Sequence, residues 1–337
     1  MKKILFFRPL FSLGGTEIAI LNLIKRLENY EIFVAYSDET SDKHLLKRFS
    51  PYAKVINLNE IDKIEIDYFI PASAHYNLDK EVNKIKSKKT ILWIHHLINI
   101  ETTILADKEK MKNIDCVLTV SKTTANILKS LFPEQKKKIK TIYNVINDEE
   151  IIKQSKEPIT LPLAKDLNLV TVARVCKEKG FLRMLELAKA LVKEKINFKW
   201  FIVGDNYYKD QVKEIYNKFK EFKDYFVWFG FIDNPHNIVK QCDYEVLLSD
   251  DETWGLVLTE AMILNVPCIS GDFPVAFEQI KDKENGVILK NLEPDTYIDR
   301  VQDIVKNKTK YKNAVKNYKY NNKEIIKKWD ELLNEKY

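Results

Sequence analysis

Glycine and cysteine are scarce in this chain, and no hydrophobic run is long. Only eight glycines and four cysteines occur among 337 residues, although glycine usage averages about 7%. No segment approaches about 18 consecutive apolar residues, so the sequence predicts no membrane-spanning helix. The cysteines never form a C-x-x-C pair, and each lies in or beside an apolar run. We therefore expect buried thiols, no metal site and a reducing compartment.

Positive charge is concentrated in the first half of the chain. Residues 1–153 hold 25 basic and 20 acidic residues, whereas the remainder holds 30 and 29. Lysines cluster at 84–89 and 136–140. Charge runs usually only solvate a helix face. The alternative is an anionic partner, either a membrane surface or an anionic acceptor. Nucleic acid is disfavoured, because RNA-binding signatures and zinc-spaced ligands are missing.

The N-terminal segment resembles the start of a signal peptide only superficially. Its apolar run is broken at Arg8-Pro9, and no A-x-A site follows. We therefore expect a cytoplasmic protein. The basic clusters leave open a peripheral position on the inner face of the cell membrane.

Short apolar runs alternate with amphipathic segments along the whole chain, which is typical of βαβ units with parallel sheets. The polar stretch 147–162 contains two prolines and has the composition of a linker, and the pattern restarts after it. We therefore predict an α/β protein of two Rossmann-like domains facing a cleft, residues 1–150 and 151–321.

The same alternation gives the individual elements. Strands are predicted at 3–7, 31–36, 53–57, 66–70, 90–94, 116–120, 139–143, 168–173, 198–203, 226–229, 243–248 and 266–270. Helices are predicted at 16–28, 41–48, 78–86, 100–112, 121–131, 180–193, 208–222, 235–240, 255–264, 294–306 and 309–335.

Two glycines, Gly14 and Gly15, separate the first strand from the first helix. They let the backbone approach a ligand at a helix N-terminus, where free N–H groups attract an anion. The segment is not G-x-G-x-x-G, which disfavours a dinucleotide. An ordinary strand–helix turn is the alternative interpretation.

Arg174 and Lys179 follow the first strand of the second half. At the carboxyl end of a strand they can converge on one diphosphate, Arg as a bidentate fork and Lys as a point charge. Surface charges on a turn are the alternative.

Glu252 and Glu260 flank the start of a helix that is otherwise apolar. A carboxylate in such company accepts hydrogen bonds from a bound polyol or incurs a burial penalty. Gly255 and its neighbouring amides form a second helix N-terminus suited to an anion. Alternatively, Glu252 only caps the helix and Glu260 is solvated.

His95 and His96 end a strand of the first half. Adjacent side chains on a strand cannot both face inward, so one of them can point into the cleft. No third ligand of matching spacing supports a metal site, and a purely structural histidine is the alternative.

Together and in this order, these segments resemble family 4 of the retaining nucleotide-sugar glycosyltransferases, which have the GT-B fold. The resemblance covers about residues 3–290, and the E-x7-E pair with the upstream Arg and Lys is its specific part. The matching segments are Gly14–Glu17, Tyr143–Asn147, Arg174 with Lys179-Gly180, Val203–Asp205, Val227–Ile232, Glu252-x7-Glu260 followed by Ala261-Met262, and Val266–Ser270.

The sequence departs from the family pattern at three places. Asp205-Asn206 lacks the second glycine of V-G-x-G, Tyr143 and Val145 replace the usual Pro and Gly, and Trp254 stands where Phe is common. None of these positions carries a charge assigned to the donor site.

The resemblance implies roles for the charged residues. Arg174 and Lys179 would hold the donor diphosphate, Glu260 the ribose hydroxyls and Glu252 the hydroxyls of the transferred sugar. No metal and no cofactor beyond the nucleotide-sugar co-substrate would be needed, because fixed cations stabilise the leaving diphosphate.

The resemblance also implies supporting positions. Amides at Gly15, Gly255 and Leu256 would assist the diphosphate, and the base would lie near Phe231 and Ile232. His95 or His96 would reach the sugar and, with Glu252, Arg174 and Lys179, complete the catalytic set.

The resemblance implies a retaining hexosyltransferase that uses a UDP-sugar, or less favourably a GDP-sugar, and a glycan, glycolipid or cell-surface polymer as acceptor. Residues 1–150 would form the acceptor domain, onto which a C-terminal helix at about 322–337 would pack, and 151–321 the donor domain. The alternatives are another GT-B enzyme, such as a nucleotide-sugar 2-epimerase, and a non-catalytic sugar-binding subunit.

Overall fold

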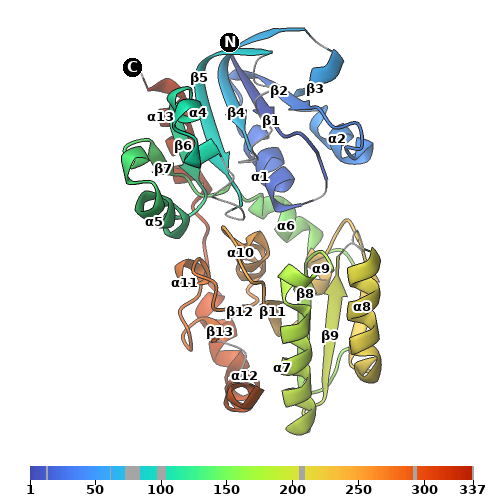
Figure 1. Ribbon diagram of the computed structural model, residues 1–337. Coiled ribbons are helices and arrows are strands. Elements are labelled where there is room, and N and C mark those ends of the chain that lie inside the picture. The colour runs from blue at the N-terminus through green and yellow to red at the C-terminus, as the bar shows by residue number, and fades with distance from the viewer. Residues whose placement is uncertain are drawn as a thin grey trace. The chain divides into compact units, whose positions relative to one another are not determined.

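The computed structural model describes residues 1–12, 14–60, 62–72, 84–96, 104–204, 209–290 and 294–335. The chain divides into two compact units (Figure 1). The first comprises Met1–Ile146 with Asn321–Tyr337, and the second comprises Asn147–Tyr320. Each unit holds one parallel sheet flanked by helices.

The first unit has a seven-stranded sheet in the order β3-β2-β1-β4-β5-β6-β7, so the strand order reverses between β1 and β4. Its strands are β1 (Lys2–Phe7), β2 (Tyr30–Tyr36), β3 (Lys54–Asn57), β4 (Ile64–Pro71), β5 (Ile85–Ile94), β6 (Cys116–Thr119) and β7 (Ile139–Thr141). Its helices include α1 (Gly15–Ile24), α2 (Lys43–Phe49), α4 (Lys108–Lys112), α5 (Lys122–Leu131) and α13 (Asn322–Asn334).

Helix α13 belongs to the first unit although the whole second unit precedes it in the chain. Trp329 on α13 is fully buried, with its ring centroid 5.0 Å from that of Trp93 on β5. At the end of the helix, Lys89 Nζ donates to the Leu332 carbonyl (3.2 Å) and lies 3.5 Å from the Glu335 carboxylate. A cation near the last carbonyls of a helix is favourable, so α13 is held both by its apolar face and by its end.

The second unit has a six-stranded sheet in the order β10-β9-β8-β11-β12-β13, which reverses between β8 and β11. Its strands are β8 (Leu167–Val172), β9 (Phe198–Val203), β10 (Phe226–Gly230), β11 (Tyr244–Leu247), β12 (Cys268–Gly271) and β13 (Gly286–Leu289). Its helices include α6 (Asp148–Gln154), α7 (Phe181–Lys193), α8 (Lys209–Phe219), α9 (His236–Val239), α10 (Leu256–Ile263), α11 (Ala276–Gln279) and α12 (Pro294–Val315).

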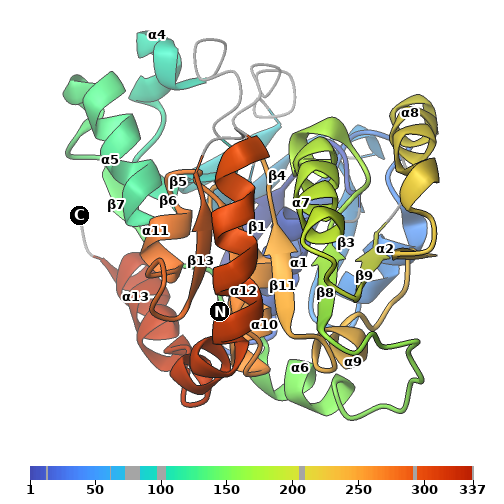
Figure 2. The ribbon, with the colours of Figure 1, turned by 90° about the horizontal axis from the view of Figure 1, so that it is seen from below.

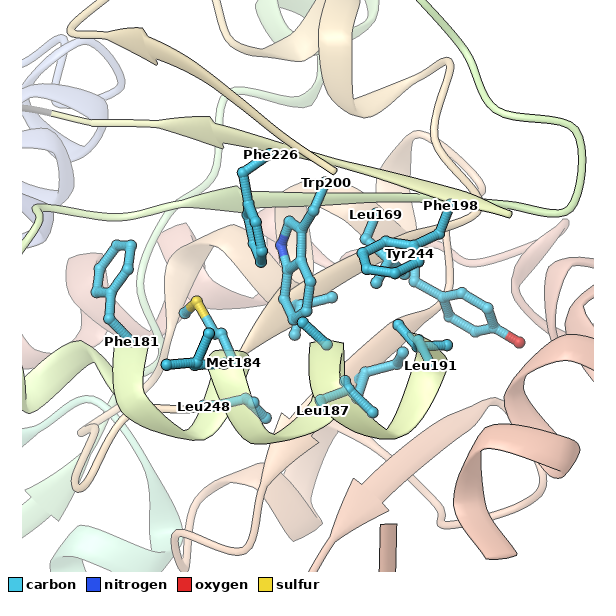
Figure 3. Close-up of a cluster of buried hydrophobic side chains, with 14 of the residues drawn as sticks. Leu169, Phe181, Met184, Leu187, Leu191, Phe198, Trp200, Phe226, Tyr244 and Leu248 are labelled. Atoms are coloured by element: carbon cyan, nitrogen blue, oxygen red, sulfur yellow. The ribbon is translucent and has the colours of Figure 1, made fainter. Parts of the chain in front are cut away.

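One face of this sheet packs against α7 and α12, which lie side by side (Figure 2). Trp200 of β9 points from the sheet toward Met184 and Leu187 of α7 (Figure 3). Its indole Nε1 donates to Thr171 Oγ1 (3.0 Å), and that hydroxyl donates to the Val246 carbonyl (2.8 Å). The polar atoms of this buried tryptophan and threonine are therefore satisfied, as a close-packed core requires.

The segment predicted as a linker, 147–162, begins with helix α6 instead. The side chain of Asn147 accepts a hydrogen bond from the backbone N–H of Glu150 and caps the helix. Acidic residues fill the first turn, where they complement the helix dipole. The remaining residues, 155–162, form neither helix nor strand, so the linker prediction is wrong only for α6.

The helices at the end of the sequence are divided differently from the prediction. In place of 294–306 and 309–335, the structure has α12 up to Val315 and α13 from Asn322. Tyr311 and Val315 are buried on the same face as the earlier part of α12. Because both side chains are buried, the helix continues past the predicted break.

Besides α6, the short elements α11 and β13 were not predicted. The predicted helix 78–86 does not match the structure where it can be compared, because β5 begins at Ile85 and residues 78–83 lie outside the described residues. Residues 100–103 of the predicted helix 100–112 also lie outside them, and the remainder forms a short 3-10 turn followed by α4.

The cysteine prediction is confirmed with respect to burial. Cys116, Cys176, Cys242 and Cys268 are all buried, free thiols. Burial raises the pKa of Cys116 and of Cys176 to about 11. In the described part of the chain, no helix has the length and apolar character needed to cross a membrane.

Candidate functional site

The loops after β8 and β11 lie side by side where the strand order of the second unit reverses. The loop after β8 carries Arg174 and Lys179, and the loop after β11 runs from Asp250 to Gly255. The backbone N–H of Asp250 donates to the Glu178 carbonyl (2.8 Å) and joins the two loops. Open parallel sheets bind ligands at this position, outside the carboxyl ends of the strands.

Gly180 allows the close approach of these loops. Its φ is +73°, and an added Cβ would lie 1.7 Å from the Leu248 carbonyl oxygen, so no other residue fits without a shift. Arg183 Nε donates to the same carbonyl (2.6 Å), and its guanidinium also pairs with Asp250. The start of α7 is thus fixed against the end of β11.

Lys179 and Glu252 form an ion pair between the two loops. Lys179 Nζ lies 2.6 Å from Glu252 Oε1, and Ser249 Oγ donates to the same oxygen (2.8 Å). The two charged side chains are only 22% and 15% exposed, so solvent screens them less than a surface pair. The residues expected to hold the diphosphate and the sugar are therefore in direct contact.

Arg174, in the same loop as Lys179, is half-buried. A hydrogen bond from the Cys176 thiol is the main cause that lowers the pKa of Glu178, and the positive charges of Arg174 and Lys179 lower it further. Both cations thus lie within electrostatic reach of one carboxylate. The same placement would let them act on one bound anion.

Helix α10 begins at this edge of the sheet. Gly255 is its N-cap with φ +73°, a conformation that favours glycine, and Leu256 is its first residue. No side chain caps this end. The first amides of the helix and its dipole therefore offer hydrogen-bond donors and partial positive charge to an anion.

A buried polar network holds the loop that connects Glu252 to α10. Trp254 Nε1 donates to Thr259 Oγ1 (3.0 Å), and Thr259 Oγ1 donates to Gln279 Oε1 (2.7 Å). The Gln279 amide in turn donates to the Trp254 carbonyl. The first of these bonds needs an indole N–H, which the phenylalanine common at this position in the resembled family cannot supply.

Glu260 lies on α10 with its side chain 18% exposed, and it contacts a residue that the sequence did not reveal. His236 Nε2 on α9 is 3.5 Å from Glu260 Oε2, and His236 Nδ1 is 2.8 Å from Gln154 Oε1. No periodicity or motif in the sequence links His236 to Glu260. The contact follows only from the packing of α9 against α10.

Phe231 and Ile232 follow β10, and Phe231 is 48% exposed. In the sheet order, β9 separates β10 from β8, so these residues are not adjacent to the β8 and β11 loops in the sheet. The role expected for them at the base stays a prediction. Asp205 and Asn206, where the sequence departs from V-G-x-G, lie outside the described residues.

In the first unit, Gly14 caps α1 and Gly15 is its first residue. Thr16 Oγ1 lies 3.4 Å from His96 Nε2, so the end of β5 reaches the start of α1. His96 is exposed, whereas the neighbouring His95 is 7% exposed. The glycine loop and His96 therefore share one surface of this unit.

His95 lies in the core of the first unit. Its ring centroid is 4.4 Å from that of Trp93. Burial lowers the pKa of His95 well below its ordinary value, and the charges of His96 and Arg8 lower it further. Arg8 forms a largely buried ion pair with Glu17 of α1 (3.1 Å). Of the two histidines, His96 is the one whose side chain a substrate can reach.

No group of three or more His, Cys, Asp or Glu side chains within the described ranges is arranged to hold a metal ion. The β8–β11 edge instead offers two cations and a helix N-terminus, which donate hydrogen bonds, and two carboxylates, which accept them.

Two parallel Rossmann-like sheets, with these charged loops at a strand-order reversal, are the architecture of the GT-B fold. Residues 153–322, half of the chain, match the family model described as glycosyl transferases group 1. The chain belongs to this family. The structure of Anabaena HepE in complex with UDP and glucose superposes with a TM-score of 0.75 at 18% identity, over 100% of both chains.

Curated relatives agree with this family assignment. An O-antigen biosynthesis glycosyltransferase of Escherichia coli, WclY, is 23% identical over 87% of this chain and 86% of its own. The N-acetyl-α-D-glucosaminyl L-malate synthase of Bacillus anthracis is 21% identical over 83% of this chain and 77% of its own. An uncharacterised 41.2 kDa protein in the cps region of Klebsiella pneumoniae is 28% identical, but this chain spans only 46% of its length.

Proposed function

We propose that this protein is a retaining glycosyltransferase that transfers a hexose-type sugar from a UDP-sugar to a glycan, glycolipid or cell-surface polymer. The observation that carries the proposal is the Lys179–Glu252 contact at the β8–β11 reversal, with Arg174 in the same loop as Lys179 and the start of α10 directly after the loop of Glu252. Uridine as the base is supported by the structural neighbour that binds UDP and glucose.

Arg174 and Lys179 bind the diphosphate of the donor. Lys179 carries three N–H donors, so it can hold a phosphate oxygen while it keeps its 2.6 Å contact with Glu252. Glu252, next to it, accepts hydrogen bonds from the hydroxyls of the transferred sugar. The amides of Gly255 and Leu256 add donors to the diphosphate, and we assign the same role to Gly15 in the first unit.

Glu260 accepts hydrogen bonds from the ribose hydroxyls, and Phe231 with Ile232 borders the base. A carboxylate mostly excluded from water is costly unless it is paired. Glu260, at 18% exposure, has the 3.5 Å contact with His236 Nε2 but forms no hydrogen bond with it, so its carboxylate gains from binding a polyol.

The transfer needs no metal ion in this proposal. The acceptor hydroxyl oxygen attacks the anomeric carbon from the face that the diphosphate leaves, the bond from that carbon to the diphosphate oxygen breaks, and the departing phosphate takes the acceptor proton. The anomeric configuration is thereby retained. Arg174, Lys179 and the start of α10 stabilise the negative charge that develops on the diphosphate, and His96 contacts the substrate from the first unit.

The first unit is proposed to bind the acceptor. A polymer or glycan acceptor is supported by the relative that takes part in O-antigen biosynthesis, whereas the L-malate synthase shows that a relative's acceptor can also be a small anion. Fewer lysines are available to bind an anionic membrane than the sequence suggested. Most lysines of the two clusters have partners within the first unit, among them Lys86, Lys88, Lys89 and Lys140.

A panel of nucleotides and nucleotide-sugars in a thermal-shift assay tests the donor. A ligand at 100 times its Kd adds about 2.7 kcal/mol to the free energy of unfolding, so UDP and one UDP-sugar should raise the midpoint clearly. Release of UDP that depends on an added acceptor separates transfer from the two alternatives. A nucleotide-sugar 2-epimerase would turn over without an acceptor, and a non-catalytic sugar-binding subunit would release no UDP.

A further inference from the structure

The carboxylate of Glu260 has a protein partner on a different helix. His236 Nε2 lies 3.5 Å from Glu260 Oε2, with the two side chains 13% and 18% exposed. The other ring nitrogen, Nδ1, lies 2.8 Å from Gln154 Oε1. Three helices of the second unit, α6, α9 and α10, thus contribute one residue each to a continuous polar chain.

The orientation of the imidazole is fixed by this chain. The Gln154 amide nitrogen donates to Glu150 Oε1 (3.5 Å), which leaves Gln154 Oε1 as the atom facing His236. Since that oxygen can only accept, Nδ1 carries a proton. The opposite nitrogen, Nε2, faces Glu260 Oε2 at 3.5 Å, an ion-pair distance at which the two atoms form no hydrogen bond.

The backbone around His236 is held in the same way. Asn234 Nδ2 donates to the Gln154 carbonyl (3.0 Å), and Asn234 Oδ1 accepts from the His236 N–H (3.1 Å). The position of the ring relative to α6 is therefore set by backbone and side-chain contacts together. A side chain so constrained can in turn constrain the carboxylate it contacts.

We propose that His236 is a positioning residue for Glu260 in nucleotide binding. Its ring lies on the Oε2 side of the carboxylate, which leaves Oε1 as the acceptor for a ribose hydroxyl. The proposal rests on the proposed function, because it assumes that Glu260 binds the ribose.

The test measures the affinity of purified full-length variants for UDP and for 2′,3′-dideoxy-UDP by calorimetry. His236→Gln should weaken UDP binding about tenfold, because the carboxylate loses the ring that holds it in place. Its affinity for the dideoxy nucleotide should be unchanged, because that ligand offers no ribose hydroxyl to Glu260. In a Glu260→Gln background, the same substitution should have no further effect on UDP.

His44→Gln is the matched control, because His44 is exposed on α2 in the first unit, and it should bind both nucleotides like the unmodified protein. If His236→Gln does not fold, Gln154→Leu replaces it. That variant removes the Nδ1 acceptor and should weaken UDP binding while sparing the dideoxy nucleotide.

Equal weakening of both nucleotides by His236→Gln would overturn the proposal, since a merely structural role affects both alike. Full additivity with Glu260→Gln would overturn it as well. Failure of the proposed function looks different. In that case the unmodified protein does not bind UDP, or Glu260→Gln does not discriminate between the two nucleotides.

Discussion

Lys179 Nζ and Glu252 Oε1 are 2.6 Å apart, which joins the loop after β8 to the loop after β11 by a partly buried ion pair. A substitution at either residue therefore changes the surroundings of the other. Removal of Lys179 leaves Glu252 with the hydrogen bond from Ser249 Oγ. Removal of the Glu252 charge leaves the Lys179 ammonium free to bind a phosphate without competition.

Arg174→Ala and Lys179→Ala should each weaken UDP binding without unfolding the protein. Charge-assisted hydrogen bonds contribute about 1.5–3 kcal/mol each, so the loss is about ten- to a hundredfold or slightly more. Lys177→Ala is the control, because Lys177 lies in the same loop but pairs with Glu214 at an exposed position (2.9 Å). Unchanged UDP affinity in both of the first two variants would remove the diphosphate from this loop.

Glu260→Gln and Glu252→Gln should separate nucleotide binding from turnover. Glu260→Gln keeps the shape but loses the charged acceptor for the ribose, so it should mainly weaken UDP binding. Glu252→Gln should leave UDP binding nearly intact or slightly tighter, because Lys179 loses its competitor, while kcat falls. Calorimetry with UDP and steady-state kinetics with the sugar donor measure the two effects. An equal loss of UDP binding in both variants contradicts this division of roles.

Transfer should persist in excess EDTA, because the charge on the leaving diphosphate is met by Arg174, Lys179 and the start of α10. The measurement is the initial rate of UDP release with and without chelator, using protein dialysed beforehand. Abolition by EDTA with rescue by Mn²⁺ or Mg²⁺ is the result that would exclude the proposed mechanism.

Glu245→Gln should stabilise the protein increasingly as the pH rises. Glu245 on β11 is fully buried, and its Oε1 accepts from the Val172 N–H (3.0 Å). Burial, and then the charge of Glu260, raises its pKa well above 4.5. The neutral form of Glu245 contributes its full stabilisation below the pKa that this carboxyl has in the unfolded chain. The stabilisation is lost as the pH rises toward the higher pKa of the carboxyl in the folded protein.

The Glu245→Gln variant keeps an oxygen that accepts from the Val172 N–H but cannot ionise. It therefore does not lose stability in this way as the pH rises. Chemical unfolding between pH 5 and 8 should show a growing difference, with a slope of at most about 1.4 kcal/mol per pH unit. A difference that does not change with pH would mean that Glu245 is ionised in the folded protein.

Binding to anionic vesicles, if it occurs, should depend on Lys136 and Lys137. Both are exposed, whereas Lys138 next to them donates to the carbonyls of Met111 and Ile114. Each lysine near an anionic surface adds about 1 kcal/mol. Co-sedimentation at low salt should therefore fall for the double Lys→Gln variant and vanish in high salt. Indifference to lipid charge would leave an acceptor in solution as the better proposal.

The sequence predicts the strands of both sheets well because buried parallel strands are short apolar runs bounded by turns. β13, Gly286–Leu289, was missed, although other strands of the same length, such as β6 and β11, were predicted. Helix α12 was divided wrongly because Asn307 and Lys308 interrupt the apolar pattern locally, while Tyr311 restores it one turn later.

The sequence predicts those parts of the candidate site whose residues lie close together along the chain. Glu252 and Glu260 flank one helix start, and Arg174 and Lys179 share one loop, so each pair is visible in the sequence. The contact of Lys179 with Glu252 and that of His236 with Glu260 depend on which strands and helices become neighbours. Several of the clustered lysines also have partners that lie far away in the sequence. The sequence cannot show that Lys89 is used to bind the end of α13.

The discontinuity of the first unit has a consequence during synthesis on the ribosome. The second unit is one uninterrupted segment, whereas the first needs Trp329 and its neighbours on α13 to cover Trp93. Chains usually fold from the N-terminus as they emerge, at about 5–20 residues per second. In this protein the first unit emerges before the second but completes its core after it. Trp93 can pack against Trp329 only when nearly all of the sequence shown has been translated.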